Sequence, residues 1–388
     1  MFNNTRRIFM RNYDSPCIFV VVVYFVIICG WSFLKVFNEP RYWRQRNIIE
    51  KVDELSRIMS LERINENPEF ERFSRSLQLL SNPGYVIFYD SSNLDITYNH
   101  ICNLKSMPNS LSRLAAVSFD KKAYEEFDEK YPEIPNVLID LDDIKNSMPE
   151  NLENRKYIFY QIILLVRTRI CAALASRGID FWAMQQDTLW IDNFSSMDLE
   201  HRYPNALMLF DTVGNDLIPE YDRMRGWICG STFFVRGNPT TFQFFSQIDT
   251  MMRTMQSPDS SIMTYLCGHR QYKCQRLPRW IISSSNYFLG PRANVPVLVQ
   301  VDTDSRELSK REVFQNSKFI FRSSNGTCDE KSVRKLRSAV QEALPNLIRT
   351  NIDYTEKIYN VWKYQLKSIF NKDPYNNKLF LTVHYGLI

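Results

Sequence analysis

The chain has 388 residues, enough for one large α/β domain with additional segments or for two average domains. Hydrophobic residues make up 44% and charged residues 23%, a composition that excludes wholesale disorder. The net charge of +5 comes from both signs mixed along the chain, without a basic face interleaved with aromatic residues. Nucleic acid is therefore not an expected partner.

The first 34 residues have the pattern of a membrane anchor. Residues 17–34 (CIFVVVVYFVIICGWSFL) carry no charge and reach the roughly 18-residue length that a bilayer-spanning helix needs. No small-residue cleavage site follows, so we expect residues 1–16 to be a cytoplasmic tail and residues 17–34 to be an uncleaved transmembrane signal anchor. Basic residues flank both ends of the span, so the positive-inside rule does not decide its orientation.

Two further patterns favour a lumenal location for the rest of the chain. The glycosylation sequons at Asn193 and Asn325 are usable only in the lumen. Six cysteines lie outside the span, an even number that allows one to three disulfides, and Cys267 and Cys274 are the closest pair in sequence. We expect a single-pass type II protein of the Golgi or endoplasmic reticulum membrane. A zinc module is not expected, because no C-x-x-C pair occurs.

Residues 35–82 are polar and helix-prone, and we expect a stem. Apolar residues recur at Ile48, Val52, Leu55 and Met59, which is heptad spacing over two repeats. Coiled coils are identified over three or four repeats, so a solvated helical spacer is the preferred interpretation. The sequence leaves open whether two chains form a homodimer through this stem.

Apolar runs alternate with helical patterns after the break at residues 82–84. Continuous apolar strands that alternate with helices are typical of a mostly parallel sheet covered by helices on both faces. We therefore predict an α/β domain over residues 83–325 and a helical extension over residues 326–388. The predicted strands are 85–89, 114–119, 136–141, 179–184, 206–210, 227–235, 296–301 and 318–321; the predicted helices are 121–130, 155–176, 330–349 and 351–370.

The candidate chemistry begins directly after the strand 179–184, at Gln185 and Asp187, with Asp192 five residues further on. Open α/β sheets bind ligands outside the carboxyl ends of their strands. A hard cation such as Mn²⁺ or Mg²⁺ favours carboxylate oxygens and can bridge the diphosphate of a nucleotide sugar, where it acts as a Lewis acid. The alternative is that Asp187 only begins a turn.

The order of these elements resembles the nucleotide-diphospho-sugar transferase domain of GT-A-type glycosyltransferases, a family with plant arabinosyl- and xylosyltransferase members and many nematode relatives. In that family a helix and a Gly-containing turn lead into a strand that ends in D-x-D, followed by apolar residues and Trp. The resemblance spans roughly residues 84–320. The matching segments here are 177–190, 228–235, 257–261 and 117–120.

The chain departs from the family pattern at four places. Gln185 stands at the first Asp of D-x-D, and Ile228 or Cys229 at the Asn of the N-T-G-F segment. Ser260 replaces the Gln of a D-Q element. The stretch 299–302 (VQVD) lies where family members usually offer a His after the last strand.

The resemblance implies transfer of a sugar from a nucleotide sugar to a glycan or glycoprotein acceptor in the secretory pathway. Because of Gln185, a catalytically silent relative that binds a glycan or a partner enzyme is the alternative. A surface turn is the simpler interpretation of Asp211 and Asp259, and core packing that of Trp182 and Trp190. The implied roles are catalysis for Asp187 and Asp259, metal or ribose binding for Asp187, and donor binding for Gln185, Asp211, Gly230 and Ser231.

Overall fold

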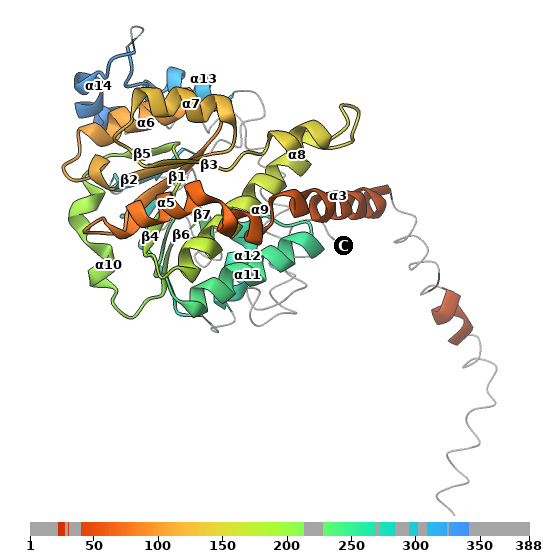
Figure 1. Cartoon of the computed structure of the whole chain (residues 1–388). Helices are drawn as coiled ribbons and strands as arrows, with labels where there is room; N and C mark the ends of the chain where they lie inside the picture. Colours follow the sequence, from red (N-terminus) through yellow and green to blue (C-terminus); the bar gives the residue numbers. More distant parts are fainter. Residues whose placement is uncertain are drawn as a thin grey trace, which may run out of the picture.

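The computed structural model describes residues 22–27, 30, 40–212, 228–268, 272–283, 295–301, 309–323 and 326–340. Over these ranges the chain forms an α/β domain in which helices cover both faces of a central sheet (Figure 1). The strands of this sheet are β1 (Gly84–Tyr89), β2 (Leu114–Ser118), β3 (Asn136–Leu138), β4 (Phe181–Met184), β6 (Met208–Thr212), β7 (Ile228–Val235) and β8 (Cys274–Arg276).

The central sheet is mostly parallel, as predicted. Its order is β3-β2-β1-β4-β7-β6-β8, and the four strands from β3 to β4 run parallel to one another. β7 is the exception, because it runs antiparallel to both of its neighbours, β4 and β6. Met184 at the carboxyl end of β4 pairs with Thr232 in the middle of β7, and the amino-terminal half of β7 continues past the end of β4. The two strand ends therefore lie at the same edge of the sheet.

Alternate side chains of each strand enter different cores, as the pleat of a strand requires. In β1, Val86 and Phe88 pack with α9 (Arg155–Ser176) and α11 (Pro239–Thr254), whereas Tyr85, Ile87 and Tyr89 pack with α6 (Leu94–Lys105) and α7 (Lys121–Lys130) on the other face. The helices of the domain are α6 (Leu94–Lys105), α7 (Lys121–Lys130), α8 (Asp142–Ser147), α9 (Arg155–Ser176), α10 (Leu199–Arg202), α11 (Pro239–Thr254), α12 (Asp259–Gly268), α13 (Lys310–Asn316) and α14 (Glu330–Arg334).

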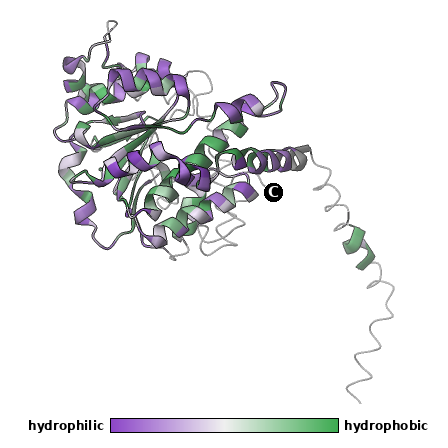
Figure 2. Cartoon of the chain, in the orientation of Figure 1, coloured by the Kyte–Doolittle hydropathy of each residue, from purple (hydrophilic) through white to green (hydrophobic). Residues whose placement is uncertain are grey.

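The helix α9 lies in the main core. Within the described ranges it is the one helix long and apolar enough to cross a membrane, yet 83% of its apolar window is buried inside the domain. Figure 2 shows the strands and α9 mainly in green, and α3 (Pro40–Ser56) and α7 mainly in purple. A helix that is apolar on all sides belongs in a core, so the prediction of a buried helix at residues 155–176 is confirmed.

A small second sheet lies beside the carboxyl end of β4. It consists of β5 (Thr188–Trp190), β10 (Leu298–Gln300) and β9 (Ile282–Ser283), in that order. β10 runs antiparallel to β5, with Gln300 opposite Thr188. This pairing brings a residue from the last third of the chain next to the Gln185–Asp187 turn.

The segment predicted as a solvated stem is packed on the domain from Ile48 onward. Ile48, Val52, Leu55 and Met59 are all buried, and they join the core that contains α9. The prediction of a solvated spacer was therefore wrong here, and the apolar face that we considered for a homodimer is covered by the chain's own domain. The helices of this segment are α3 (Pro40–Ser56), η1 (Arg57–Met59), α4 (Leu61–Glu66) and α5 (Pro68–Gln78).

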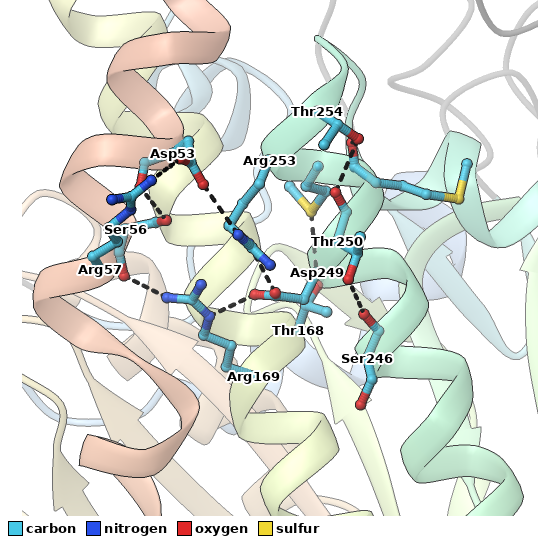
Figure 3. Close-up of polar contacts among 12 residues, drawn as sticks. Asp53, Ser56, Arg57, Thr168, Arg169, Ser246, Asp249, Thr250, Arg253 and Thr254 are labelled. Atoms are coloured by element: carbon cyan, nitrogen blue, oxygen red, sulfur yellow. Dashed lines mark hydrogen bonds and ion pairs between the residues drawn. The ribbon is translucent and has the colours of Figure 1, made fainter.

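An ionic network holds α3 on α9 and α11 (Figure 3). Arg169 of α9 donates from Nε to Asp249 Oδ1 of α11 at 2.5 Å and from Nη1 to the Met59 carbonyl oxygen at 2.7 Å. Arg253 bridges the same Asp249, at 3.0 Å, to Asp53 of α3, at 3.1 Å. Arg169 is only 6% exposed, so this network replaces the hydration that a buried guanidinium loses.

Two disulfides cross-link the described residues. Cys102 of α6 is bonded to Cys328, and Cys267 of α12 to Cys274 of β8. The first joins the start of the predicted C-terminal extension to the domain, 226 residues away in sequence.

Three predictions on the ends of the chain have different outcomes. The strand predicted at residues 318–321 is wrong, because Lys318 lies in a turn with a φ of +60° and residues 319–321 belong to no strand. The helix predicted from residue 330 is present as α14, and residues 336–340 are helical as well. Most of the predicted anchor and the helix predicted at 351–370 lie outside the described residues; residues 22–27 of the anchor are helical and exposed.

The network on α3 gives a matched pair of variants. We expect Arg169→Met to lower the free energy of unfolding by about 1.5–3 kcal/mol, because it removes a buried charged group that donates hydrogen bonds to Asp249 and to the Met59 carbonyl oxygen. Arg57→Met removes an exposed pair with Asp53, with the Arg57 side chain 74% exposed, and should cost less than about 1 kcal/mol. Urea unfolding followed by tryptophan fluorescence measures both, and equal losses would contradict this account of the docking of α3.

Candidate functional site

The polar residues predicted at the strand ends do come to one edge of the sheet. Gln185 and Asp187 follow β4, Asp211 lies at the carboxyl end of β6, and Gly230 and Ser231 lie at the amino end of the antiparallel β7. The carboxyl edge of a mostly parallel sheet is where α/β proteins bind their ligands. Within this edge, the side chains form separate groups.

The first group contains Gln185, Asp187, Gln300 and Lys310, and we call it the Asp187 cluster. Gln300 Nε2 donates to Asp187 Oδ1 at 2.5 Å and to Gln185 Oε1 at 3.0 Å. The Asp187 carboxylate can only accept, so the N–H₂ end of the Gln300 amide must face it. The other end of the amide, Gln300 Oε1, accepts a hydrogen bond from Thr188 Oγ1. Asp187 and Gln300 are 2% and 1% exposed, so the centre of the cluster is buried.

Lys310 completes the cluster from a distant part of the chain. Its ammonium forms an ion pair with Asp187 Oδ2, while 41% of its side chain remains exposed. Lys310 is the first residue of α13, where a capping box fixes the first turn: Ser309 Oγ donates to Glu312 Oε2 at 2.7 Å and accepts from the Glu312 N–H at 3.3 Å. Arg311 ties the same turn to Asp95 of α6 at 2.5 Å.

The donor set of the cluster does not fit the divalent cation that the resemblance implied. Both Asp187 oxygens and the Gln185 oxygen face N–H donors of Gln300 or Lys310. A hard cation in that place would meet an ammonium and an amide N–H₂, and a single carboxylate. Nor do the described ranges contain any group of three or more His, Cys, Asp or Glu side chains that could hold a metal ion.

One face of α6 positions the backbone around Asp187. Asn103 makes a two-way amide pair with Trp190, donating to its carbonyl oxygen at 3.0 Å and accepting from its N–H at 2.7 Å. Asn99 makes the same kind of pair with Phe319 and Phe321, at 2.8 and 2.6 Å. These asparagines lie one turn apart, so α6 supplies to β5 and to residues 319–321 the hydrogen bonds that a neighbouring strand would otherwise make.

His100 lies between these two asparagines on α6. Its Nδ1 lies 3.0 Å from the Thr188 carbonyl oxygen, which can only accept, so Nδ1 carries the proton. Burial lowers the pKa of His100 to about 4, against smaller opposing effects of that hydrogen bond and of Asp187. The imidazole is therefore neutral near pH 7 and acts as a hydrogen-bond donor to the backbone next to Asp187.

The second group, which we call the Asp211 clasp, joins β6 to β7. The Asp211 carboxylate accepts from the N–H groups of Gly230, Ser231 and Thr232 at 2.9, 3.2 and 3.1 Å, and from the Ser231 hydroxyl. Burial raises the pKa of Asp211, and these four donors oppose that effect. The side chains of Asp211 and Ser231 are thus hydrogen-bonded to each other. They lie where the pairing of β6 with β7 shifts register, between Phe210 and Thr212.

Two features of the backbone at position 230 require glycine. Its φ is +73°, and a Cβ atom there would lie 2.9 Å from the Ser260 Cβ of α12. The element that approaches Gly230 closely is therefore α12. Asp259, the residue before Ser260, is 2% exposed and forms an ion pair with Arg167 of α9. The predicted catalytic side chain thus has a buried partner at the start of α12.

The remaining candidates lie away from the Asp187 cluster. Asp192 is exposed and pairs with Arg337 at 3.0 Å. Trp182 and Trp190 are fully buried in the core, as expected, with Trp182 Nε1 donating to Glu200 at 2.8 Å. Asn193 is partly exposed and its side-chain oxygen is buried, whereas Asn325 lies outside the described residues.

A mostly parallel sheet with polar residues gathered at its carboxyl edge has the arrangement in which open α/β proteins bind their ligands. Residues 109–314, just over half of the chain, match the family model described as nucleotide-diphospho-sugar transferase. The chain belongs to this family, and the predicted resemblance is confirmed. No curated protein matches the chain.

Several solved structures are similar to the chain at low identity. They include the apo form of mouse xyloside xylosyltransferase 1, with 8% identity over 58% of this chain and 99% of that chain and a TM-score of 0.39. Galactosyltransferase LgtC with donor and acceptor sugar analogues has 11% identity over 58% and 90% and a TM-score of 0.39. Glycosyltransferase GlyE of Streptococcus pneumoniae TIGR4 has 10% identity over 70% and 67% and a TM-score of 0.38.

The buried His100 predicts how stability depends on pH. Below pH 6.5 the unfolded chain takes up a proton on this imidazole, whereas the folded protein does so only near pH 4, so falling pH favours unfolding across that window. The contribution of His100 is complete above pH 6.5, and on the order of 3 kcal/mol is lost by pH 4.

Urea unfolding at a series of pH values measures this effect. The loss between pH 6.5 and pH 4 should be smaller by that amount in His100→Asn than in the wild type. His201→Asn, at an exposed histidine beside Asp198, is the matched control and should keep a wild-type loss. A wild-type loss in His100→Asn would show that His100 is not neutral in the folded protein.

Proposed function

We propose that the protein is a nucleotide-sugar-dependent glycosyltransferase that moves a sugar to a glycan or protein acceptor. The observation that carries this proposal is the Asp187 cluster, which lies directly after β4 at the carboxyl edge of the sheet, in a chain that belongs to a nucleotide-diphospho-sugar transferase family. The donor's diphosphate would lie against this cluster. The predicted roles of Asp211, Gly230, Ser231 and Asp259 in donor or acceptor binding stay predictions.

Asp187 has a definite task in this proposal. Its two carboxylate oxygens orient the Gln300 amide and the Lys310 ammonium, and Gln185 supplies an oxygen to the same amide. A catalytic arrangement is sensitive to such orientation, because a displacement of about 1 Å can cost on the order of a hundredfold in rate. Asp187 would thus hold the polar groups that contact the donor.

A catalytically silent relative is the second candidate. The observation that favours it is the amide of Gln185 at the first carboxylate position of the family's D-x-D motif. Such a protein would bind a glycan or a partner enzyme without turning over a nucleotide sugar.

A membrane-anchored lumenal topology completes the proposal. The disulfides Cys102–Cys328 and Cys267–Cys274 support an oxidising compartment, and residues 17–34 would anchor the chain in the Golgi or endoplasmic reticulum membrane.

The catalytic proposal is tested first by ligand binding. The full chain in detergent should unfold at a higher temperature with UDP, GDP or their sugars, because a ligand at about a hundred times its dissociation constant stabilises a fold by roughly 2.7 kcal/mol. Asp187→Asn should lower hydrolysis of the bound nucleotide sugar about a hundredfold, whereas Asp192→Asn, at an exposed carboxylate outside the Asp187 cluster, should leave it unchanged. Binding without hydrolysis or transfer by the wild type would favour the silent relative, and absence of binding by any nucleotide would contradict the donor site.

The topology predicts N-linked glycans on the chain. In cells with a secretory pathway, peptide N-glycosidase should lower the apparent mass of the wild type and leave a variant with Asn193→Gln and Asn325→Gln unchanged. A wild-type chain that shows no such change, and that added protease digests in intact microsomes, would contradict a lumenal domain.

A further inference from the structure

The four side chains of the Asp187 cluster carry no net charge among themselves. Asp187 contributes one negative charge and Lys310 one positive charge, while Gln185 and Gln300 are neutral. The family's D-x-D motif with a divalent cation would also be neutral, with two carboxylates against two positive charges. Replacing one carboxylate by Gln185 and the cation by Lys310 therefore preserves the local charge.

The geometry points to a donor site in which the Lys310 ammonium binds the diphosphate of a nucleotide sugar in place of a divalent cation. This inference rests on the proposed function, because it presupposes a nucleotide-sugar donor.

The position of Lys310 suits this role. An ammonium has three N–H donors on a tetrahedral centre, so it can contact a carboxylate and a diphosphate at once. The carboxylate side is the buried Asp187, with 3% of its side chain exposed, whereas 41% of the Lys310 side chain is exposed. The ammonium thus lies at the boundary between the buried cluster and the solvent from which a nucleotide would enter.

The surroundings of Lys310 hold it in place. The Ser309–Glu312 capping box sets the first turn of α13, Arg311 binds Asp95 of α6, and Phe314 packs in the core beneath the small sheet. A lysine side chain loses conformational entropy when it is fixed. Because the ion pair with Asp187 already restricts Lys310, less entropy is lost when a ligand binds. Asp187 is therefore a positioning residue for Lys310.

A divalent cation is disfavoured at the same place for two reasons. The Gln300 amide directs its N–H₂ group, not its oxygen, toward Asp187 and Gln185, because its oxygen accepts from Thr188. A cation would also have to displace the ammonium from Asp187 Oδ2 or share that carboxylate with it.

The test measures the affinity of the full chain in detergent for UDP and GDP by calorimetry, once in EDTA and once in Mn²⁺. We expect the wild type to bind the preferred nucleotide with the same affinity in both. Lys310→Met should weaken binding about tenfold or more in both, the loss typical of a hydrogen bond to a charged group. Lys331→Met, at an exposed lysine of α14, is the matched control and should bind as the wild type does.

Two further variants keep the test decisive if Lys310→Met does not fold. Lys310→Arg keeps the positive charge and should bind in EDTA. The double variant Gln185→Asp/Lys310→Met restores two carboxylates and removes the ammonium, so its binding should require Mn²⁺.

The outcomes separate this inference from the proposed function. Wild-type binding that occurs in Mn²⁺ but not in EDTA would overturn the role of Lys310 and leave the nucleotide-sugar site standing. Wild-type affinity of Lys310→Met in EDTA would overturn it as well. Absence of UDP and GDP binding in both conditions would overturn the nucleotide-sugar site itself, and the inference with it.

Discussion

A carboxylate that is buried at the edge of a sheet must be compensated, and the architecture around Asp187 is organised by that constraint. Its oxygens face Gln300 from β10 and Lys310 from α13, two elements that follow it by more than a hundred residues. β10 reaches the site because it pairs with β5, and β5 is held by Asn103 and His100 of α6. The small sheet, α6 and α13 thus all contribute to the placement of one charge.

The rest of the domain supplies a rigid base for that edge. The Asp211 clasp joins β6 to β7 by three backbone N–H groups, and Gly230 lets α12 approach β7 closely. α9 fills the core beneath β4, and the Arg169 network fixes the N-terminal helices on its outer side. A buried, fully hydrogen-bonded frame of this kind is what allows exposed polar groups to be held in a defined geometry.

The alternation of strands and helices was predictable from the sequence, because the strands are continuous apolar runs and a helix such as 121–130 begins after Asp120 and ends before Tyr131 and Pro132. The run at residues 85–89 and the helix at residues 121–130 lie within one residue of their predicted ends. The antiparallel direction of β7 was not predictable, since a run such as 228–235 has the same pattern in either direction. The stem was misjudged because four apolar residues at heptad spacing are equally compatible with a dimer seam and with packing on the chain's own domain.

The site was predictable only in part. Gln185 and Asp187 follow a recognisable strand, but Lys310 gives no local signal, because an N-terminal lysine of a short helix is common on surfaces. Gln300 could be noticed only as a replacement for an expected His, and its contact with Asp187 depends on the pairing of β10 with β5. Asp211 follows an apolar strand just as Asp187 does, yet the structure engages it with backbone N–H groups, a difference that spacing along the chain does not encode.

The central claim is our proposal that the Lys310 ammonium, and not a metal ion, binds the diphosphate of the donor. Its most direct test is a crystal structure of the protein grown with Mn²⁺ and the nucleoside diphosphate that it binds most tightly, with anomalous diffraction recorded at the manganese edge. The account predicts a diphosphate oxygen within hydrogen-bonding distance of Lys310 Nζ and no anomalous peak between Asp187 and the diphosphate. A manganese peak coordinated by Asp187, with Lys310 displaced from that carboxylate, would contradict it.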